Sequence, residues 1–405
     1  MKSVQIVHVL IFLMVIVVST AARSRPFIFG ADISWVDQRE DSGEKYFDNG
    51  SQKDIFEILV EHKFNWIRLR VFVDPSARVP ETSESPYSSQ GYCDLPHTIE
   101  FAKRIKAAGT KFLLDFHYSD VWCDPGKQYK PMSWRDLSYD ELVEKVRSYT
   151  RESLEACEEA GVLPDMVQVG NEVVGGMIWP DGRSSNMSKF AELVNAGIDG
   201  VKDVSEDIDI MVHSISENSP TQWLSALINA GVERIDVFGL SYYSKWHGTP
   251  DDLQKRLNAV AADHDVLIAI AEYADNHERV NDIVFNLPDE KGLGTFVWEP
   301  TEWMDALFDW SSGGRSTNST IDIYPKLSKE YGNDDVVSVA ENRNAIVKRH
   351  SGSFYMDTEG TLRYTGTPIA NGTTFELFTP EGRLVTRGIF NASSIELAAS
   401  LRNGT

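Results

Sequence analysis

The feature that most restricts the fold of this chain is a regular alternation of short apolar runs and amphipathic segments between residues 27 and 331. The amphipathic segments, such as Asp54–Lys63 and Pro96–Ala108, carry apolar residues at the three- and four-residue spacing of helices. Strands that alternate with helices predict parallel βαβ units. The apolar runs are Phe27–Ile33, Trp66–Val73, Lys111–Phe116, Met166–Val169, Asp209–His213, Asp236–Tyr243, Val266–Tyr273 and Gly294–Trp298.

Eight such units in about 300 residues match the size of a (β/α)₈ barrel. We therefore predict an α/β fold, a (β/α)₈ TIM barrel, over residues 27–332. A doubly wound sheet is the alternative, and it usually carries a glycine-rich phosphate-binding turn after its first strand. In this chain the first run continues into Asp32-Ile33-Ser34-Trp35 instead.

The N-terminus has the pattern of a secretory signal peptide. Lys2 precedes the apolar run Val4–Val18, and the small residues Ser19–Ala22 follow it. We predict a signal peptide over residues 1–22 and a secreted or cell-surface protein, with a retained N-terminal anchor as the alternative. No later run is long enough to span a bilayer, so no membrane span is predicted in the mature chain.

The C-terminal part differs in texture from the barrel. Residues 333–350 read as a linker, and residues 351–405 contain short β-prone runs separated by turns such as Thr358-Glu359-Gly360. We predict a small all-β module here. Its role is open between a sorting signal, a carbohydrate-binding domain and a spacer.

Charge and cysteine content narrow the possible partners. The formal net charge of −22 repels nucleic acid and anionic lipid, whereas a neutral ligand such as a sugar is compatible with it. The three cysteines, Cys93, Cys123 and Cys157, fit no zinc site and allow at most one disulfide, whose pairing the sequence leaves open. No cofactor is predicted; the acidic segment Asp305–Asp309 does not specify a calcium loop. We expect a monomer.

Two carboxylates stand at the ends of apolar runs, where the active site of such a barrel lies. Glu172 follows the fourth run and Glu272 closes the seventh. Glycosidic hydrolysis needs such a pair, with one carboxyl protonated and the other ionised. Asn171, next to Glu172, can hydrogen-bond a ring hydroxyl as charge develops in the transition state.

Aromatic residues occur at the same ends of the runs. Trp122, Tyr242, Trp246 and Trp298 lie at run ends or just beyond them. The apolar C–H faces of sugar rings stack on such side chains, so these four are candidate sugar platforms. Tyr243 alternates away from Tyr242 and is predicted to be structural.

Four charged or ionisable residues complete the candidate site. His117 and Asp120 follow the third run, and Arg68 and Arg70 lie in the second. The two arginines point to the same side of their strand. If that side is the barrel interior, they pair with carboxylates, either in a structural role or in the site. These residues can bond sugar hydroxyls or keep the catalytic glutamates ionised.

Several motifs carrying these residues occur in order along residues 27–331. They are Phe29–Ser34, Asn65–Val71, Asp115–Gly126, Gln168–Glu172, Gly239–Tyr243 with Trp246–Thr249, and Trp298–Pro300. Together they resemble the motifs of family 53 of the glycoside hydrolases, the arabinogalactan endo-β-1,4-galactanases. The stretch His117–Asp120 with Trp122 and Asp124–Gly126 is the most diagnostic.

The resemblance implies an endo-acting, retaining hydrolase of the β-1,4-galactan side chains of pectin. It implies Glu172 as the acid/base and Glu272 as the nucleophile. Some bacterial members hold a calcium ion after the eighth strand, but this sequence does not show its ligands. The predicted substrate-binding residues are Asp32, Arg68, His117, Tyr118, Asp120, Trp122, Asn171, Tyr242, Trp246 and Trp298.

Two alternatives remain open from the sequence. Another β-1,4-glycan hydrolase, a mannanase or a glucanase, would differ only in its contacts with the sugar. A non-catalytic barrel that captures oligosaccharides would need neither glutamate. A retaining mechanism predicts carboxyl groups roughly 5 to 5.5 Å apart, and an inverting one about 6.5 to 9.5 Å.

Overall fold

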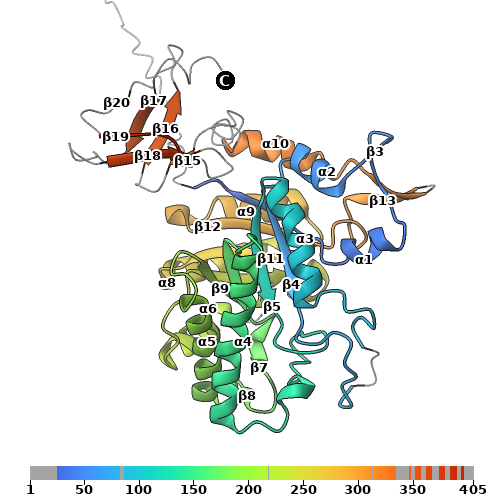
Figure 1. The fold of residues 1–405 in the computed structure, drawn as a ribbon, viewed down its shortest axis with the longest axis vertical. Coiled ribbons are helices and arrows are strands. Elements are labelled where there is room, and N and C mark those ends of the chain that lie inside the picture. Colours follow the sequence, from blue (N-terminus) through green and yellow to red (C-terminus); the bar gives the residue numbers. More distant parts are fainter. Residues whose placement is uncertain are drawn as a thin grey trace, which may run out of the picture.

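The barrel predicted from the sequence is present in the computed structural model, which describes residues 25–82, 86–217, 219–311 and 313–333 and the backbone of short strands between 346 and 395. Eight parallel strands close in the order β1-β12-β11-β10-β9-β6-β5-β4, and Figure 1 shows helices lying around the barrel. Each of the eight predicted runs overlaps one of these strands, although β9 ends two residues after its run and β12 begins two residues before its run. The doubly wound alternative is wrong because the sheet is closed. The strands are β1 (Ile28–Asp32), β4 (Trp66–Val71), β5 (Lys111–Phe116), β6 (Met166–Val169), β9 (Asp209–Ile215), β10 (Val237–Tyr242), β11 (Leu267–Tyr273) and β12 (Gly292–Trp298).

Amphipathic helices surround the barrel and cover the outward side chains of the strands. Local signals define where they begin: Ser138 and Glu141 form a capping box on α4, and Thr249 and Asp252 form one on α8. The principal helices are α2 (Ile55–Glu61), α3 (Leu95–Ala107), α4 (Tyr139–Glu159), α5 (Met187–Lys202), α6 (Pro220–Asn229), α8 (Pro250–Asp263), α9 (His277–Phe285) and α10 (Ile323–Glu330).

The barrel interior changes from apolar to polar along the strands. Successive inward residues of one strand lie two positions apart. On β4 these are Trp66, Arg68 and Arg70, so an apolar layer at the amino end gives way to charge at the carboxyl end. The apolar layer is a buried cluster of Ile28, Trp66, Leu113, Met166, Met211, Val237, Ala269, Ala271, Leu293 and Phe296. It forms a floor beneath the polar end of the barrel.

Shorter elements form the loops at the carboxyl end and one side of the barrel. A four-stranded sheet in the order β13-β14-β2-β3 joins the loop after β1 to the segment after β12. The short elements are α1 (Val36–Asp41), β2 (Tyr46–Asp48), β3 (Ser51–Lys53), η1 (Met132–Trp134), η2 (Val173–Gly175), β7 (Gly176–Met177), β8 (Gly182–Arg183), α7 (Ser244–His247), η3 (Pro288–Glu290), β13 (Phe308–Ser311) and β14 (Gly314–Thr317).

Asn333 closes the described part of the barrel onto its start. Its side-chain amide donates to the carbonyl of Phe27 at 2.8 Å, and its side-chain oxygen accepts from the N–H of Phe27 at 2.9 Å. The predicted signal peptide over residues 1–22 and most of the predicted linker over 333–350 lie outside the described residues. Between 346 and 395 the backbone forms β15 (Ile346–Val347), β16 (Gly352–Met356), β17 (Leu362–Gly366), β18 (Thr374–Phe378), β19 (Leu384–Ile389) and β20 (Ser394–Ile395). The residues that join these strands lie outside the description, so the C-terminal module stays a prediction.

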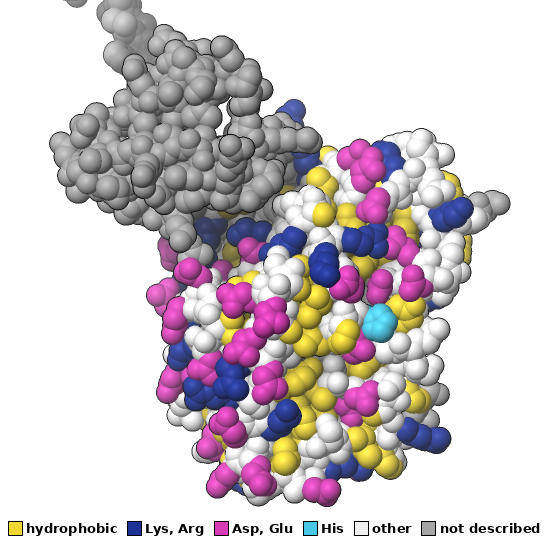
Figure 2. Space-filling view, in the orientation of Figure 1, with side chains coloured by type: hydrophobic (Ala, Val, Ile, Leu, Met, Phe, Trp, Pro, Cys, Tyr) yellow, Lys and Arg dark blue, Asp and Glu magenta, His cyan; other side chains and the backbone are white. Residues whose placement is uncertain are grey.

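The surface of the barrel carries many acidic side chains, as the net charge predicts, and the three cysteines form no disulfide. Figure 2 shows Asp and Glu side chains spread over this face of the barrel, with Lys and Arg between them. Cys93, Cys123 and Cys157 are all buried and unpaired. Within the described residues, no helix is both long and apolar enough to cross a membrane.

Candidate active site

Glu172 stands directly beyond the end of β6, in a tight turn. Its backbone is left-handed, with φ 48° and ψ 46°, and it is the residue before η2, whose first turn its side chain does not cap. Gly170 makes the turn possible, because its φ is +83° and a Cβ there would meet the Val173 side chain at 2.6 Å. A left-handed non-glycine residue is strained and persists only where its surroundings hold it.

Glu272 is aimed into the barrel by an irregularity in β11. Relative to both neighbouring strands, the register of β11 shifts around Ala271 and Glu272. Ala269 and Ala271 belong to the interior floor, so strict alternation would point Glu272 outward. The bulge reverses this and brings the carboxylate inside.

Two donors hold the Glu272 carboxylate. The Arg68 Nη2 atom lies 2.9 Å from its Oε1, and the Tyr243 hydroxyl donates to its Oε2 at 3.1 Å. Each carboxylate oxygen therefore has a partner. Because both partners stabilise the charged form, they oppose the cost of burying this charge.

The two glutamates differ in their electrostatic surroundings. Burial raises the pKa of Glu172 well above its ordinary value, and the charge of Glu272 raises it further. Burial also raises the pKa of Glu272 above its ordinary value, although the nearby Arg68 opposes this rise. The proton shared by this pair therefore resides on Glu172, and Glu272 ionises first.

Arg68 is the centre of the polar end of the barrel. Its guanidinium donates to Asp32 at 2.7 Å, to Asp115 at 2.9 Å and to the Asn171 side-chain oxygen at 2.9 Å. Gln168 accepts from its Nε at 3.1 Å. The sequence left open whether this arginine is structural or part of the site; its contacts serve both purposes at once.

Arg70 forms a second cluster one step nearer the cleft. It donates to Asp32 at 3.3 Å and pairs with Glu299, and its guanidinium lies 4.9 Å from the centre of the Trp122 ring. Burial raises the pKa of Asp32, but Arg70 and Arg68 outweigh this and hold it below its ordinary value. Asp32 is therefore an ionised link between the two arginines.

His117 and Asn171 support the same network. The Nε2 atom of His117 lies 3.1 Å from Asp115, while its Nδ1 accepts from the N–H of Cys123 at 3.3 Å. The side-chain amide of Asn171 donates to the Cys123 carbonyl at 2.9 Å. The second amide hydrogen of Asn171 can therefore donate to a substrate hydroxyl. This contact with substrate stays a prediction.

Tryptophans line the site near Arg70. Trp298 meets Trp122 edge to face at 5.7 Å between ring centres, and it packs against Trp35 at 5.0 Å. Trp246 is 52 % exposed and lies 5.4 Å from the ring of Tyr243, which holds Glu272. Three of the four predicted platforms therefore lie beside Arg70 or beside the Tyr243 ring that contacts Glu272: Trp122, Trp298 and Trp246.

The prediction for Tyr242 is corrected. Its side chain is fully buried on the helix side of β10, and its hydroxyl donates to the Gly248 carbonyl at 2.9 Å. Ser241 faces the interior and contacts His213, so the next inward residue is Tyr243. The expected roles of the two tyrosines are thus exchanged, and alternation counted from Ser241 could have shown it.

Tyr118 and Asp120 also lie away from the candidate substrate site. Tyr118 is 1 % exposed and its hydroxyl bonds the Thr150 hydroxyl of α4 at 2.7 Å, because it alternates outward after His117. Asp120 accepts from the backbone N–H of Asp74 at 3.0 Å and from that of Met132 at 2.7 Å. Asp120 therefore joins two loops, and both of its oxygens are occupied.

Five residues of the polar cluster were not predicted as site residues from the sequence. They are Asp115, Gln168, His213, Tyr243 and Glu299. The first four share one signal, an inward position in the strand alternation at the carboxyl end of a run. Burial raises the pKa of Glu299 to about 8, although Arg70 lowers it.

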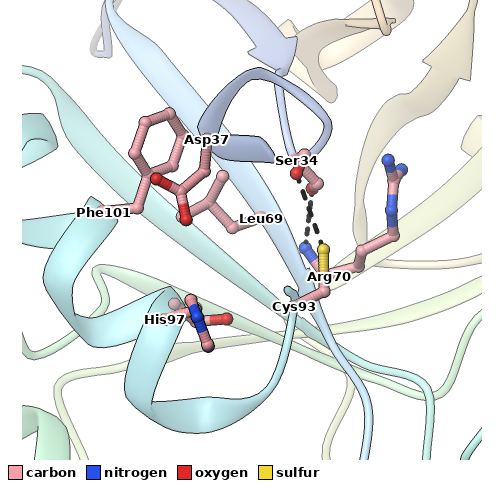
Figure 3. Close-up of a pocket in the computed structure, with 8 residues that line it drawn as sticks. Ser34, Asp37, Leu69, Arg70, Cys93, His97 and Phe101 are labelled. Atoms are coloured by element: carbon pink, nitrogen blue, oxygen red, sulfur yellow. Dashed lines mark hydrogen bonds between the residues drawn. The ribbon is translucent and has the colours of Figure 1, made fainter. Parts of the chain in front are cut away.

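A small cavity lies behind β4, with Arg70 among its lining residues (Figure 3). Its volume of about 10 Å³ suits a single water molecule. The Cys93 thiol donates to the Ser34 carbonyl there, and burial raises the pKa of this thiol to about 12. Figure 3 shows the Arg70 side chain pointing away from the other lining residues. The cavity is too small for a sugar, and its thiol is not a nucleophile at neutral pH.

Replacing Tyr243 with Phe tests the contact with Glu272. We expect kcat to fall about 10- to 100-fold, because a hydrogen bond to a charged group is worth about 1.5–3 kcal/mol. The acidic limb of the kcat/KM profile should move to higher pH, since losing a donor raises the carboxyl pKa. Tyr242→Phe is the matched control, and equal kinetics in the two variants would contradict this placement.

The closed barrel with a protonated and an ionisable carboxyl at its carboxyl end defines a barrel glycosidase. Among the residues described, no group of three or more His, Cys, Asp or Glu is arranged to hold a metal ion. The profile of "Glycosyl hydrolase family 53" matches residues 28–282. This chain belongs to that family.

Individual relatives agree with this assignment. The chain is 37% identical over 336 residues to a Niallia circulans protein described as "Uncharacterized protein in bgaB 5'region", covering 72% of this chain and 88% of that one. It is 29% identical to the "Endo-beta-1,4-galactanase" of Bacillus subtilis, covering 87% and 86%. A solved Ignisphaera aggregans GH53 catalytic domain matches with a TM-score of 0.67 and 34% identity, over 74% of this chain and 95% of that one.

Proposed function

We propose that this glycosidase is a secreted, endo-acting, retaining enzyme that cleaves β-1,4-galactosidic bonds in galactan and in the type I arabinogalactan side chains of pectin. The observation that carries the proposal is the unequal pair of carboxyls: Arg68 and Tyr243 contact Glu272 directly, whereas burial and the charge of Glu272 raise the pKa of Glu172. The similarity to the Bacillus subtilis protein named "Endo-beta-1,4-galactanase" supports the substrate. The pattern of residues 1–22 supports secretion.

In the first step, the Glu272 carboxylate attacks the anomeric carbon and the bond to the leaving oxygen breaks. Glu172 gives its proton to that oxygen, so the leaving chain departs as a neutral alcohol. Arg68 and Tyr243 fix both oxygens of Glu272 and limit its motion before attack. A fixed nucleophile shortens the path to the reacting geometry.

In the second step, Glu172 must accept a proton from water, so its pKa has to fall. The interaction between the charge of Glu272 and the Glu172 carboxyl provides this fall. The charge of Glu272 is one reason why the pKa of Glu172 is raised. In the glycosyl ester that charge is gone, so the pKa of Glu172 falls and its carboxylate becomes a general base. Water then attacks the anomeric carbon, the ester bond breaks and the configuration is retained.

An assay on a panel of polysaccharides tests the substrate. The full chain is incubated with β-1,4-galactan, type I arabinogalactan, β-1,4-mannan and a soluble β-1,4-glucan, and new reducing ends are counted. We expect release from the two galactose-containing polymers, with intermediate-length products appearing first. Preferred cleavage of mannan or glucan would overturn the substrate assignment, and binding without cleavage of any polymer would support a non-catalytic barrel.

The stereochemical outcome is measured on the same reaction. Proton NMR of the first products should show the β-anomer before mutarotation, as double displacement requires. Initial appearance of the α-anomer would rule out Glu272 as a nucleophile and require an activated water in its place.

A further inference from the structure

We propose that His213 and Ser241 act together as positioning residues for Glu172, with His213 holding its backbone N–H and Ser241 its carboxyl. This inference rests on the proposed function only in that Glu172 is the acid/base. His213 and Ser241 lie on β9 and β10 and are both fully buried. One of them contacts the backbone of Glu172 and the other its side chain, and Glu172 has a strained backbone conformation.

The first half of this device acts on the backbone. The N–H of Glu172 donates to the Nδ1 atom of His213 at 3.3 Å. The same nitrogen lies 3.0 Å from the Gln168 side-chain amide and 3.0 Å from the Asn171 side-chain oxygen. Two N–H donors thus face it against one acceptor, and the backbone donor cannot change. Nδ1 therefore carries a lone pair rather than a hydrogen.

The second half follows from the tautomer. Burial, together with Arg68 and His117, lowers the pKa of His213 well below its ordinary value, so the ring is neutral and its hydrogen sits on Nε2. That nitrogen lies 2.9 Å from the Ser241 hydroxyl oxygen, which must accept from it. The hydrogen of Ser241 is then free to point at Glu172, whose carboxyl pKa this hydrogen bond lowers.

The arrangement explains how a left-handed Glu172 stays in one position. Its φ of 48° is costly for a residue with a side chain, and the turn could otherwise relax toward a common conformation. The imidazole fixes the peptide plane before Glu172, while the hydroxyl fixes the carboxyl after it. The His213 ring, which contacts both the Glu172 N–H and Ser241, thus fixes the backbone of Glu172 and the orientation of its carboxyl together.

Other charges near Glu172 are left unchanged by a change at Ser241. They come from Glu272 on β11, Asp124 in the loop after β5, and Arg68 on β4. The phenol of Tyr243, after β10, also interacts with Glu172. His213 itself faces Arg68 and His117. A Ser241 variant therefore removes the hydrogen bond from Ser241 to Glu172 and leaves these charged groups in place.

The primary test is Ser241→Ala, with Ser214→Ala as the matched control. Ser214 is a buried serine of β9 whose hydroxyl lacks a hydrogen-bond partner among the described residues. Carbon-13 NMR of labelled glutamate carboxyls gives the pKa of Glu172 in the free protein, without substrate. We expect this pKa to rise in Ser241→Ala and to stay unchanged in Ser214→Ala, because only the first removes a donor to the carboxylate. In turnover, kcat should fall about tenfold in Ser241→Ala alone.

Two His213 variants separate the two halves. In His213→Asn the side-chain oxygen can replace Nδ1 as an acceptor while the contact with Ser241 is lost, so its kinetics should resemble those of Ser241→Ala. In His213→Gln a polar group reaches toward Ser241 while the backbone acceptor is lost, and kcat should fall about a hundredfold.

The pKa measurement tests the role of Ser241 even if the substrate of the enzyme is not galactan. An unchanged Glu172 pKa in Ser241→Ala overturns it, whether or not the enzyme cleaves galactan. Equal losses in His213→Asn and His213→Gln would also overturn it, because a merely structural histidine predicts no difference between them. If the pKa rises as expected but no polymer is cleaved by the unmodified chain, the positioning inference stands and the proposed function fails.

Discussion

Replacing Glu272 with Gln is expected to abolish turnover of galactan and to leave binding of galacto-oligosaccharides in place. An amide has nearly the shape of the carboxylate but cannot form the glycosyl ester. Loss of a catalytic nucleophile typically costs about 10⁴-fold or more in kcat. The Glu272 side chain is buried between Arg68 and Tyr243, so an amide of the same size can remain in its position.

Reducing-end release measures kcat for this variant, and calorimetric titration with an oligosaccharide measures binding. Glu278→Gln provides the matched control, since Glu278 is half exposed in α9 and pairs with Lys326 of α10. The control should retain full kcat. Full activity of Glu272→Gln would remove Glu272 from the mechanism, and loss of binding as well would indicate a local collapse rather than a lost nucleophile.

The barrel could be predicted from the sequence because each strand and helix has its own local periodicity. The alternation of runs such as Met166–Val169 with helical segments gives both the element order and the number of units. Glu172 and Glu272 could then be placed at one end, because parallel strands bring their carboxyl ends together. These steps need only local pattern and chain order.

The errors over the two tyrosines have one physical cause. The sequence predicts Tyr242 and Tyr118 as substrate-binding residues although both side chains point away from the barrel interior, because alternation shows which residues share a side but not which side is the interior. The bulge in β11 is a separate feature that the sequence does not predict: it breaks the alternation around Ala271 and brings Glu272 inside. No local pattern in Val266–Tyr273 announces that bulge.

The network around Arg68 could not be predicted because its partners are distant in sequence. Arg68 contacts Asp32, Asp115 and Glu272, and the last of these lies about two hundred positions further along the chain. Side-chain pairing over such separations depends on barrel closure and on the length of each strand. Closure is a property of the whole fold rather than of any segment.

Replacing Arg68 with Met is expected to destabilise the barrel by about 3–5 kcal/mol at neutral pH. Removing one partner of a buried ionic cluster leaves uncompensated charges in a medium that solvates them poorly. Here three carboxylates, those of Asp32, Asp115 and Glu272, lose their shared cation. Denaturant unfolding measures the loss. Arg279→Met is the control, because Arg279 is 45 % exposed, and exposed pairs contribute only about 0–1 kcal/mol.

The pH dependence of this loss tests its electrostatic origin. In the native protein burial raises the pKa of Asp32, but Arg70 and Arg68 outweigh burial and hold this pKa below its value in the unfolded chain. Ionised Asp32 therefore stabilises the fold at pH values above the unfolded pKa. This stabilisation disappears as the pH falls through the folded pKa. Without Arg68, the carboxylates gain protons at higher pH in the folded state, which relieves the uncompensated charge. The gap in unfolding free energy between the native chain and Arg68→Met should therefore narrow as pH falls from 7 toward the carboxyl range. A gap of constant size would mean that Arg68 stabilises the barrel by packing its stem and not by its charge.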